Sequence, residues 1–389
     1  MLNKAKAVQE LMVAWRRDIH AHPELGFKEF HTAQKIADVM ANLGYRVRTG
    51  VGKTGVVAEM GEGKPVVAIR ADMDALPIPE ANDVPYKSRN EGVLHACGHD
   101  AHVAIALGTA KLLAEEKMTG TVRFLFQPAE EIQDDDGLSG APRMIEDGAI
   151  DGADCVLALH VDSSLKTGEI EIDEFSAAGV DSFTASIYGK GGHGAMPHTT
   201  VDPIVISGHV ILGIQSIVSR RLWPFDPAVI TIGSIHSGQA ANVIPDEVQL
   251  SGTIRYLTSQ VRDSIHAEID RVMAISKIMG GDYKLSFLSG YPPMSNHPEM
   301  VALIKSVAGE LIGESKIAKP KPEMGSEDFG YFAQDIPGAM YILGCLIEGD
   351  PRRHHDPRFD IDEDCMPIGA AIMAQSTLTY MDQYSSPSD

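Results

Sequence analysis

Val122-Arg123-Phe124-Leu125-Phe126-Gln127-Pro128-Ala129-Glu130-Glu131 is the most informative segment of this chain. Its first half is apolar and aromatic, which is typical of a buried strand. The strand has to stop at Pro128, because proline has no backbone N–H to donate to a central ladder. The two carboxylates that follow repel each other at a buried strand end unless a cation compensates their charge. A solvated loop is the competing interpretation of this pair.

Other short β-branched or aromatic runs have the same character, at 66–69, 155–160 and 340–343. Asp72 and Asp74 follow the run at 66–69, and His160 is the last residue of the run at 155–160. Helical periodicity lies between and before the runs, at 2–22, 29–43 and 102–117. This alternation predicts an α/β fold whose sheet is covered by helices on both faces. Because ligands of such sheets collect at carboxyl ends of strands, we expect one shared site.

The middle of the chain has a different order of elements. Strands are predicted at 182–188, 228–234, 247–256 and 283–288, and helices at 202–221 and 259–279. This βαββαβ order is that of a ferredoxin-like, split-βαβ unit. Candidate metal ligands occur both before and after this unit, so we expect it to be inserted into the catalytic domain. The predicted domains are a discontinuous catalytic domain, 1–178 with 295–389, and an inserted domain, 179–294.

Composition narrows the class of partner. The chain has 389 residues and a formal charge of −21, which argues against binding nucleic acid or an anionic membrane and favours small molecules. Four cysteines do not make a disulfide framework, and charged residues run through positions 1–20 in place of an apolar signal core, so we expect a cytoplasmic protein. The longest apolar run, 203–214, is shorter than the ~20 residues that span a bilayer, so no membrane helix is expected.

His95-Ala96-Cys97-Gly98-His99-Asp100 supplies the first ligand types. One glycine separates Cys97 from His99, so both side chains can face the same ion. A buried free cysteine beside a structural histidine explains this pair equally well in isolation. His160 would by itself be a core histidine. In Arg352-Arg353-His354-His355-Asp356-Pro357, either histidine can serve as a ligand, and a basic surface loop is the alternative.

Taken together, these residues favour a metal-dependent hydrolase. Adjacent glutamates point in different directions, so one can coordinate metal while the other holds an attacking water. A nucleophilic Cys97 would leave Glu130, Glu131 and His160 unexplained. The string at 189–194 satisfies G-x-G-x-x-G, but no helix pattern follows it, which argues against a dinucleotide site.

Seven separated motifs, in order along nearly the whole chain, resemble those of one family. They are RADMDALP at 70–77, HACGHD at 95–100, PAEE at 128–131, GKGGHGAMPH at 189–198, NVIP at 242–245, GSEDF at 325–329 and HDPRF at 355–359. The chain is similar to the metal-dependent amidohydrolases that include aminoacylases, hippurate hydrolases and indole-acetyl-amino-acid hydrolases, within the zinc-type exopeptidase superfamily.

This resemblance implies a two-metal centre, with Glu130 as general base. Its implied ligands are a bridging Cys97, His99 and His160 on one ion, and Glu131 and His355 on the other. The choice of His355 over His354 follows related sequences, in which the ligand lies two residues before the proline. Thiolate and imidazole ligands suit zinc; carboxylate and imidazole also suit manganese, cobalt or nickel.

The resemblance also implies roles outside the ligand set. Asp74 is expected to support the ligands from behind, and the inserted domain is expected to act as a lid that forms a homodimer or a higher homo-oligomer. His193 is expected to polarise the scissile carbonyl, in its own subunit or in its partner's. Asn242 and Arg255 are expected to bind substrate, with Arg255 pairing with a free α-carboxylate through its planar fork.

The predicted activity is hydrolysis of the amide bond of N-acyl amino acids, which releases a carboxylic acid and a free amino acid. The alternatives on the same centre are a dipeptidase or carboxypeptidase, or an N-acetyl-diaminopimelate deacetylase. A metal-holding binding protein without turnover is a third interpretation, and Glu130 argues against it because no ligand role remains for this residue.

Overall fold

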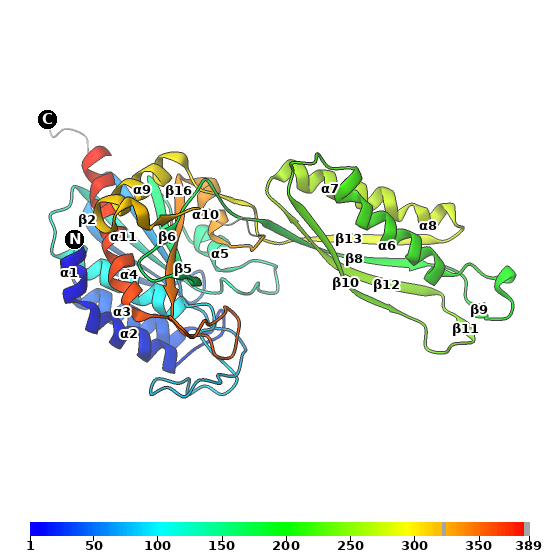
Figure 1. The fold of residues 1–389 in the computed structure, drawn as a ribbon, viewed down its shortest axis with the longest axis horizontal. Helices are drawn as coiled ribbons and strands as arrows, with labels where there is room; N and C mark the ends of the chain where they lie inside the picture. Colours follow the sequence, from blue (N-terminus) through cyan, green and yellow to red (C-terminus); the bar gives the residue numbers. More distant parts are fainter. Residues whose placement is uncertain (321–323, 385–389) are drawn as a thin grey trace. The chain divides into compact units, whose positions relative to one another are not determined.

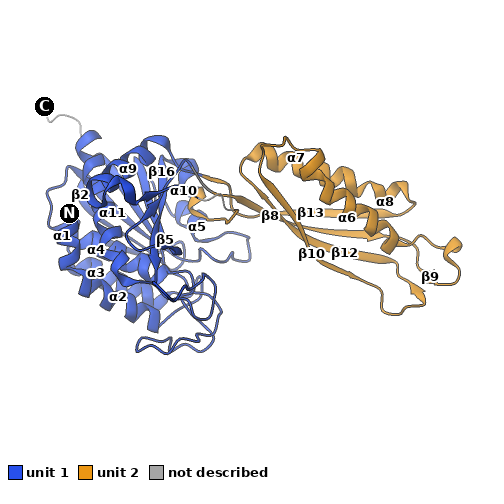
Figure 2. Cartoon of the chain, viewed as in Figure 1, with its two compact units in different colours: residues 1–176, 295–321, 331–389 blue, residues 177–294, 322–330 orange. Residues whose placement is uncertain are grey.

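A computed structural model describes residues 1–320 and 324–384, and the chain divides into two compact units. Unit 1 contains residues 1–176, 295–321 and 331–389, and unit 2 contains residues 177–294 and 322–330 (Figure 2). The sequence predicts instead that 322–330 belongs to the catalytic domain. This segment groups with unit 2 because the Ala178 N–H donates a hydrogen bond to the Gly325 carbonyl and Arg255 reaches Ser326.

Unit 1 is built on a mixed sheet of eight strands in the order β1-β2-β4-β3-β5-β16-β6-β15 (Figure 1). The central pairs β4–β3, β3–β5 and β5–β16 are parallel, and β1–β2 and β2–β4 are antiparallel. The strands are β1 (Arg46–Val51), β2 (Gly55–Glu62), β3 (Val66–Asp72), β4 (Gly120–Gln127), β5 (Cys155–Lys166), β6 (Ile170–Glu171), β15 (Ile317–Ala318) and β16 (Gly338–Leu346).

Helices of unit 1 complete the α/β class that the sequence predicts. They are α1 (Leu2–Ala7), α2 (Gln9–Ala21), α3 (Phe30–Asn42), α4 (His99–Ala114), α5 (Gly140–Glu146), α9 (Pro298–Ile312) and α11 (Met366–Tyr384), with 3-10 turns η2 (Glu314–Lys316) and η3 (Glu363–Cys365); α10 (Phe329–Asp335) begins in unit 2 and continues into unit 1. The helix predicted at 2–22 is interrupted at Val8, which has a non-helical conformation. The helices predicted at 29–43 and 102–117 agree with α3 and α4 to within three residues, and α5, α9, α10 and α11 were not predicted.

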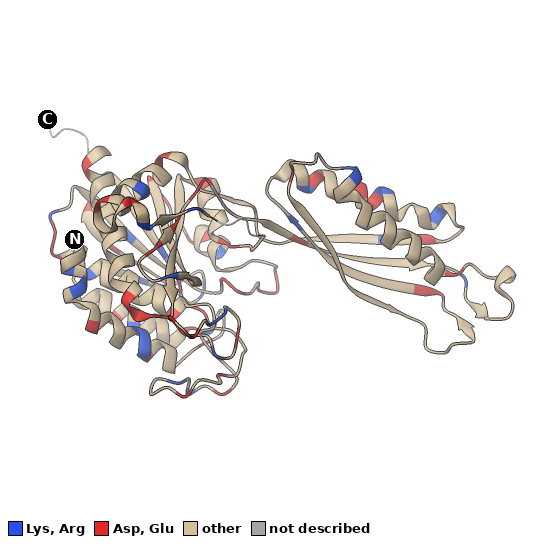
Figure 3. Ribbon diagram, viewed as in Figure 1, with Lys and Arg blue, Asp and Glu red and all other residues tan. Residues whose placement is uncertain are grey.

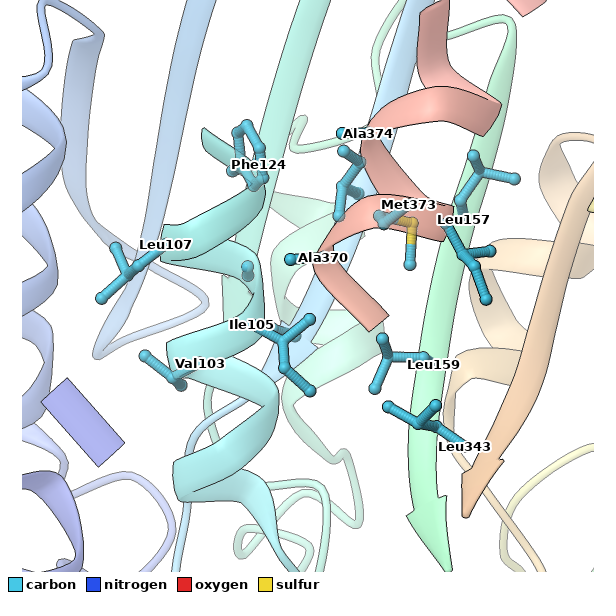
Figure 4. Close-up of a cluster of buried hydrophobic side chains, with 14 of the residues drawn as sticks. Val103, Ile105, Leu107, Phe124, Leu157, Leu159, Leu343, Ala370, Met373 and Ala374 are labelled. Atoms are coloured by element: carbon cyan, nitrogen blue, oxygen red, sulfur yellow. The ribbon is translucent and has the colours of Figure 1, made fainter. Parts of the chain in front are cut away.

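Helix α4 is the centre of the core of unit 1. Fourteen of its sixteen residues are buried, and it is apolar on all sides, as expected of a helix packed all round. Figure 4 shows Ile105 of α4 next to Leu159 of β5, with Met373 of α11 nearby, while Leu107 points to the opposite side of α4. This packing fixes the amino terminus of α4 close to the strand β5.

Unit 2 has its own four-stranded antiparallel sheet, in the order β10-β12-β8-β13. The element order β8-α6-β10-β12-α7-β13 is the predicted βαββαβ order. The elements are β8 (Gly179–Tyr188), α6 (Pro203–Arg220), β10 (Ala228–Ser237), β12 (Glu247–Tyr256), α7 (Ser259–Met273), α8 (Ile275–Ile278) and β13 (Asp282–Ser289), with β9 (Gly192–His193), β11 (Val243–Ile244) and the turn η1 (Pro197–Thr199); β7 (Phe175–Ala177) and β14 (Met294–Ser295) pair at the unit boundary. The single helix predicted at 259–279 is divided into α7 and α8 at Ala274.

By length and composition alone, helix α6 is long and apolar enough to cross a membrane. One third of this helix is buried inside the protein. Asp202 caps its amino terminus by accepting from the N–H groups of Ile204 and Val205. Its buried face, which includes Ile206, packs in the core of unit 2, whereas Leu212 on the other face is 72% exposed. Figure 3 shows charged residues of both signs along α7, whereas Arg220 is the one charged residue of α6.

Candidate metal centre

Gly98 allows two ligand types to flank a sharp turn. Its φ of 90° lies in the left-handed region, and a Cβ on Gly98 would lie 2.3 Å from Cγ2 of Val161. Only glycine fits this conformation and this close approach. Helix α4 begins immediately afterwards at His99, three residues earlier than the sequence predicts. The turn therefore presents both Cys97 and His99 to strand β5.

His160 of β5 lies on the other side of this turn. Its Nε2 is 3.6 Å from the Cys97 Sγ, and its ring centroid is 6.1 Å from that of His99. Ligand atoms of these three residues all lie within 4.8 Å of one another. The sequence prediction placed His160 at the end of its strand, but β5 continues to Lys166. His160 is nevertheless accessible to the turn, because β3 pairs with β5 only as far as Ala158.

Asp74 forms hydrogen bonds both to the segment that follows β4 and to His99. Its Oδ1 and Oδ2 accept hydrogen bonds of 3.1 Å from the backbone N–H groups of Glu130 and Glu131, respectively. His99 donates from Nδ1 to the Asp74 carbonyl at 2.9 Å, which leaves Nε2 to face the glutamates. The structure thus places Asp74 behind the ligand types, in the position from which it can orient them.

A second group forms around the Cys97 thiol with Glu131 and His355. The three ligand atoms lie within 4.8 Å of one another, and His355 Nε2 is 3.2 Å from Glu131 Oε1. His355 has a φ of 60°, an uncommon conformation for a residue with a side chain and one that often marks functional sites. The other histidine of the doublet, His354, is turned away: its Nε2 accepts from the Ser163 N–H, and its ring lies 4.9 Å from Phe359.

The donor set fits a pair of divalent cations. The two triads share Cys97, and Glu130 forms a further group with His99 and Glu131. Within the described residues, His99 Nε2 and Glu131 Oε1 are buried and have no hydrogen-bond partner of good geometry. A thiolate, imidazoles and a carboxylate are ligands that zinc and similar ions accept. Buried polar atoms that remain unpaired are costly, and a cation satisfies both.

The electrostatics of the group show what a cation would replace. Burial and the charge of Glu131 raise the pKa of the Cys97 thiol. Close polar contacts with Cys97 and Glu131 raise the pKa of His355 to about 10. Burial opposes ionisation of Glu131, but the contact with His355 and the charge of His99 outweigh it and lower its pKa. Metal ions bound to the Cys97 thiolate and the His355 imidazole would displace the protons that these groups otherwise carry.

The sequence reasoning did not single out His102 as a site residue. Its Nδ1 donates to Asp72 Oδ1 at 2.5 Å, and its Nε2 accepts from the Val161 N–H at 2.9 Å. Asp72 also accepts from Arg70 Nη1 at 2.6 Å. Burial lowers the pKa of His102 to about 4, although the charge of Asp72 opposes the shift. The spacing of three residues after His99 was the available signal, since it puts both rings on one face of a helix.

The predicted substrate residues lie in unit 2. Val243 pairs with His193 between β11 and β9, and the Asn242 carbonyl accepts from the Gly194 N–H, so His193 and Asn242 are neighbours. Arg255 lies on β12, where its Nη1 donates to Ser326 Oγ at 2.9 Å. Among the described residues, Arg255 forms no ion pair with a carboxylate. Its guanidinium therefore remains available for an anionic ligand.

Asp18, His22 and His31 also have metal-ligand spacing. Here, however, basic side chains already take the ligand atoms. Lys35 forms an ion pair with Asp18, and Arg89 Nη1 is 3.3 Å from His22 Nε2. We therefore assign no metal to this group.

Thiol, imidazole and paired carboxylate groups gathered beside the central strands β4 and β5 of a mixed sheet are the groups of a metallohydrolase. The model of Peptidase family M20/M25/M40 matches residues 68–379, so the chain belongs to this family and is a hydrolase. It is 40% identical over 382 residues to Thermostable carboxypeptidase 2 of Saccharolobus solfataricus, covering 96% of each protein. It is 38% identical over 391 residues to IAA-amino acid hydrolase ILR1-like 2 of Arabidopsis thaliana, covering 98% of this chain and 88% of that one.

A solved structure agrees with this assignment. The crystal structure of the Bacillus subtilis YXEP protein, named a dinuclear metal binding peptidase from the M20 family, matches with a TM-score of 0.84 and 32% identity. The match covers 97% of this chain and 99% of that one. The family resemblance and the fold class that the sequence predicted are therefore confirmed.

Proposed function

We propose that this chain hydrolyses the amide bond of N-acyl amino acids at a centre of two divalent ions. One ion is held by Cys97, His99 and His160, and the other by Cys97, Glu131 and His355. The single observation that carries the proposal is the pair of ligand triads that share one thiol. Zinc or manganese suits these donors best, and cobalt or nickel are the alternatives.

Glu130 is the proposed general base. When bound, the two ions polarise the scissile carbonyl and make a water more acidic. A carboxylate oxygen of Glu130 takes the proton of the attacking water and returns it to the departing nitrogen. The backbone N–H of Glu130 is fixed by Asp74, and the residue is 6% exposed, so the base is held in a site with little bulk water.

Two residues of unit 2 are the proposed substrate contacts, Arg255 for the α-carboxylate and Asn242 for the amide. Support for the carboxylate contact comes from the guanidinium of Arg255, which is half-buried and pairs with no acidic residue of the described parts of the chain. Support for the substrate class comes from the relative named as an IAA-amino acid hydrolase. The net charge of −21 favours small molecules over nucleic acid or membrane surfaces, and we expect a cytoplasmic enzyme.

Glu130→Gln tests the base. The amide keeps the size of the side chain but cannot accept the proton, so we expect kcat to fall roughly 10²–10⁴-fold while two ions stay bound. Steady-state kinetics and metal analysis are the measurements. Glu131→Gln is the matched control, because it should lose one ion. Near-normal turnover in Glu130→Gln would exclude this residue as the base.

The second activity that deserves a direct comparison is that of a carboxypeptidase or dipeptidase, because a relative of 40% identity is named a carboxypeptidase. An N-acetyl-diaminopimelate deacetylase would use the same centre. Rates on N-acetyl and N-benzoyl amino acids, on dipeptides and on N-acetyl-diaminopimelate distinguish the three. Faster hydrolysis of dipeptides than of every N-acyl amino acid would replace the proposed substrate class.

We further propose that His193, with its neighbour Asn242, acts in the site of a partner subunit. His193 and Arg255 lie toward opposite ends of β12, since β9 and β11 adjoin the end at Glu247. Eight residues of strand separate positions 247 and 255, which is about 26 Å. An N-acyl amino acid is too small to contact both residues of one unit 2. Participation of both therefore favours a homodimer in which His193 is supplied in trans.

Mixing two inactive variants tests this arrangement. Glu130→Gln subunits and His193→Ala subunits are dissociated, mixed and reassociated. If His193 acts in trans, each mixed dimer has one intact site, and activity should recover to about a quarter of the wild-type value, as expected for random pairing in a two-fold dimer. If His193 acts in cis, no activity returns. Each variant carried alone through the same procedure is the control.

The outer face of α6 is the proposed subunit contact. Ile204, Val205 and Leu212 are 48%, 52% and 72% exposed, respectively. A run of exposed apolar side chains on one helix is a mark of a protein interface. Leu212→Glu should convert the dimer to a monomer in light scattering, and a dimer of unchanged stability would place the contact elsewhere.

A further inference from the structure

We propose that His102, held by Asp72, is a positioning residue that sets the orientation and the tautomer of His160. The inference rests on the proposed two-ion function. His102 touches no substrate and has no lone pair left for an ion, because its two ring nitrogens are occupied by Asp72 and by the Val161 N–H. It acts instead on the histidine that serves one of the two ions.

The connection runs through buried groups from three elements of the sheet and from α4. Arg70 of β3 donates from Nε to Gln127 Oε1 of β4 at 2.8 Å and from Nη1 to Asp72 Oδ2. Asp72 accepts from Nδ1 of His102, and Nε2 of His102 accepts from Val161 of β5. Because a buried donor or acceptor without a partner is costly, each group in this chain holds the next in one orientation.

The backbone of Val161 connects His102 to His160 through two hydrogen bonds. The Val161 N–H is fixed by His102, and the Val161 carbonyl accepts a hydrogen bond of 2.8 Å from His160 Nδ1. With its proton on Nδ1, His160 presents the lone pair of Nε2, and this nitrogen is 3.6 Å from Cys97 Sγ. A histidine ligand needs this second hydrogen bond to fix both its ring and its tautomer.

The effect should be confined to one ion. The ring of His102 lies 4.6 Å from that of His160 and 5.4 Å from that of His99, centroid to centroid. Both histidines belong to the Cys97, His99, His160 triad. The other triad depends on Glu131 and His355, which are oriented by Asp74 and by the Ala96 carbonyl. Loss of His102 therefore weakens one site and leaves the second.

Zinc titration of the metal-free protein against a chromophoric chelator tests the inference. We expect His102→Ala to bind one zinc ion with wild-type affinity and the other 10–100-fold more weakly, the usual effect of losing such a supporting partner. His102→Gln keeps an acceptor for the Val161 N–H and should recover part of the loss. Leu107→Ala removes a buried side chain on the far side of α4 and should leave both affinities unchanged.

Nitrogen-15 spectra of histidine-labelled wild-type protein without metal give a readout that does not depend on folding of a variant. The inference predicts the Nδ1–H tautomer for both His102 and His160. The Nε2–H tautomer at His102 would overturn it. So would wild-type affinity for both ions in His102→Ala, or an equal loss in His102→Ala and Leu107→Ala; in these cases the proposed function stands. If the wild-type protein binds none of zinc, manganese, cobalt and nickel, both proposals fail.

Discussion

At the scale of single residues, Glu29 shows how a buried carboxyl supports the site without touching an ion. Its side chain accepts from the Ala129 N–H at 2.9 Å and from the hydroxyl of Thr54. Ala129 has a φ of 44°, and it immediately precedes the glutamate pair. Burial and the charge of Asp74 raise the pKa of Glu29 to about 7. The protonated form is therefore favoured in the folded protein below about pH 7.

This shift predicts a pH dependence of stability. A folded pKa above the unfolded value stabilises the protein at low pH, so the contribution is complete below pH 4.5 and is lost as pH rises through about 7. Its full size is roughly 3 kcal/mol. Glu29→Gln mimics the protonated carboxyl and should flatten the dependence of the free energy of unfolding on pH over this range, measured with urea in metal-free protein. A slope equal to that of the wild type would contradict this account.

Some residue roles were readable in the sequence and others were not. Cys97, Gly98 and His99 are adjacent, so their relation is local and the motif predicts it. His354 and His355 differ in backbone conformation and in their contacts, neither of which a sequence pattern encodes, so the family resemblance was needed to choose between them. His102 meets Asp72 across 30 residues of chain. Such a partner becomes visible only when the helix and the strand are packed.

At the scale of elements, Arg16 joins α2 to the amino terminus of α4 and to the segment that follows His355. It is fully buried, and it donates to Asp100 Oδ2 at 2.8 Å and to Asp360 Oδ1 at 2.7 Å. His20 Nδ1 lies 2.7 Å from the same Oδ2 of Asp100. These bonds hold together the two segments that bear ligand types, His99 and His355.

Arg16→Met is predicted to be strongly destabilising. The substitution leaves the buried carboxylates of Asp100 and Asp360 without the Arg16 guanidinium. Breaking a buried ion pair by removing one partner costs about 3–5 kcal/mol. Arg17→Met is the matched control, because Arg17 is exposed and its pair with Glu363 should contribute less than about 1 kcal/mol. Urea unfolding of both variants is the measurement. Equal losses of stability in the two variants would show that burial of the Arg16 guanidinium does not set the size of the effect.

The central strands and the elements of the inserted unit were predictable, whereas the long helices α9 and α11 and the outer strands β1 and β2 were not predicted. Strand β4 ends at Gln127, where the proline predicted that it would end. The sequence pattern did not predict the full length of β5, because it carries no information on which strands pair. Strand β5 extends to Lys166, since β16 continues to pair with it beyond the last residue paired with β3. Helix α7 ends at Met273 and α8 begins at Ile275, although the apolar pattern continues and Ala274 between them keeps a right-handed helical conformation.

At the scale of the whole molecule, the two units have separate hydrophobic cores. All proposed metal ligands lie in unit 1. A ligand that binds only the folded state stabilises it by about 4 kcal/mol at a thousandfold excess over Kd. Removal of metal should therefore destabilise unit 1 and leave unit 2 unchanged.

Hydrogen exchange measured by mass spectrometry resolves the two units. Peptides of α4 and β5 should lose protection when a chelator is added, and peptides of β8 and β12 should not. Returning zinc to the chelated protein should restore the protection. A uniform loss in both units would mean that the metal acts on the molecule as a whole.

The most direct measurement of the central claim is anomalous X-ray scattering from crystals grown with zinc. The account predicts two peaks, roughly 3.5–4 Å apart as in other two-metal sites, with the Cys97 Sγ within about 2.3 Å of both. One peak should also contact His99 and His160, and the other Glu131 and His355. A single peak, or peaks at the Asp18, His22 and His31 group with none beside Cys97, would contradict it.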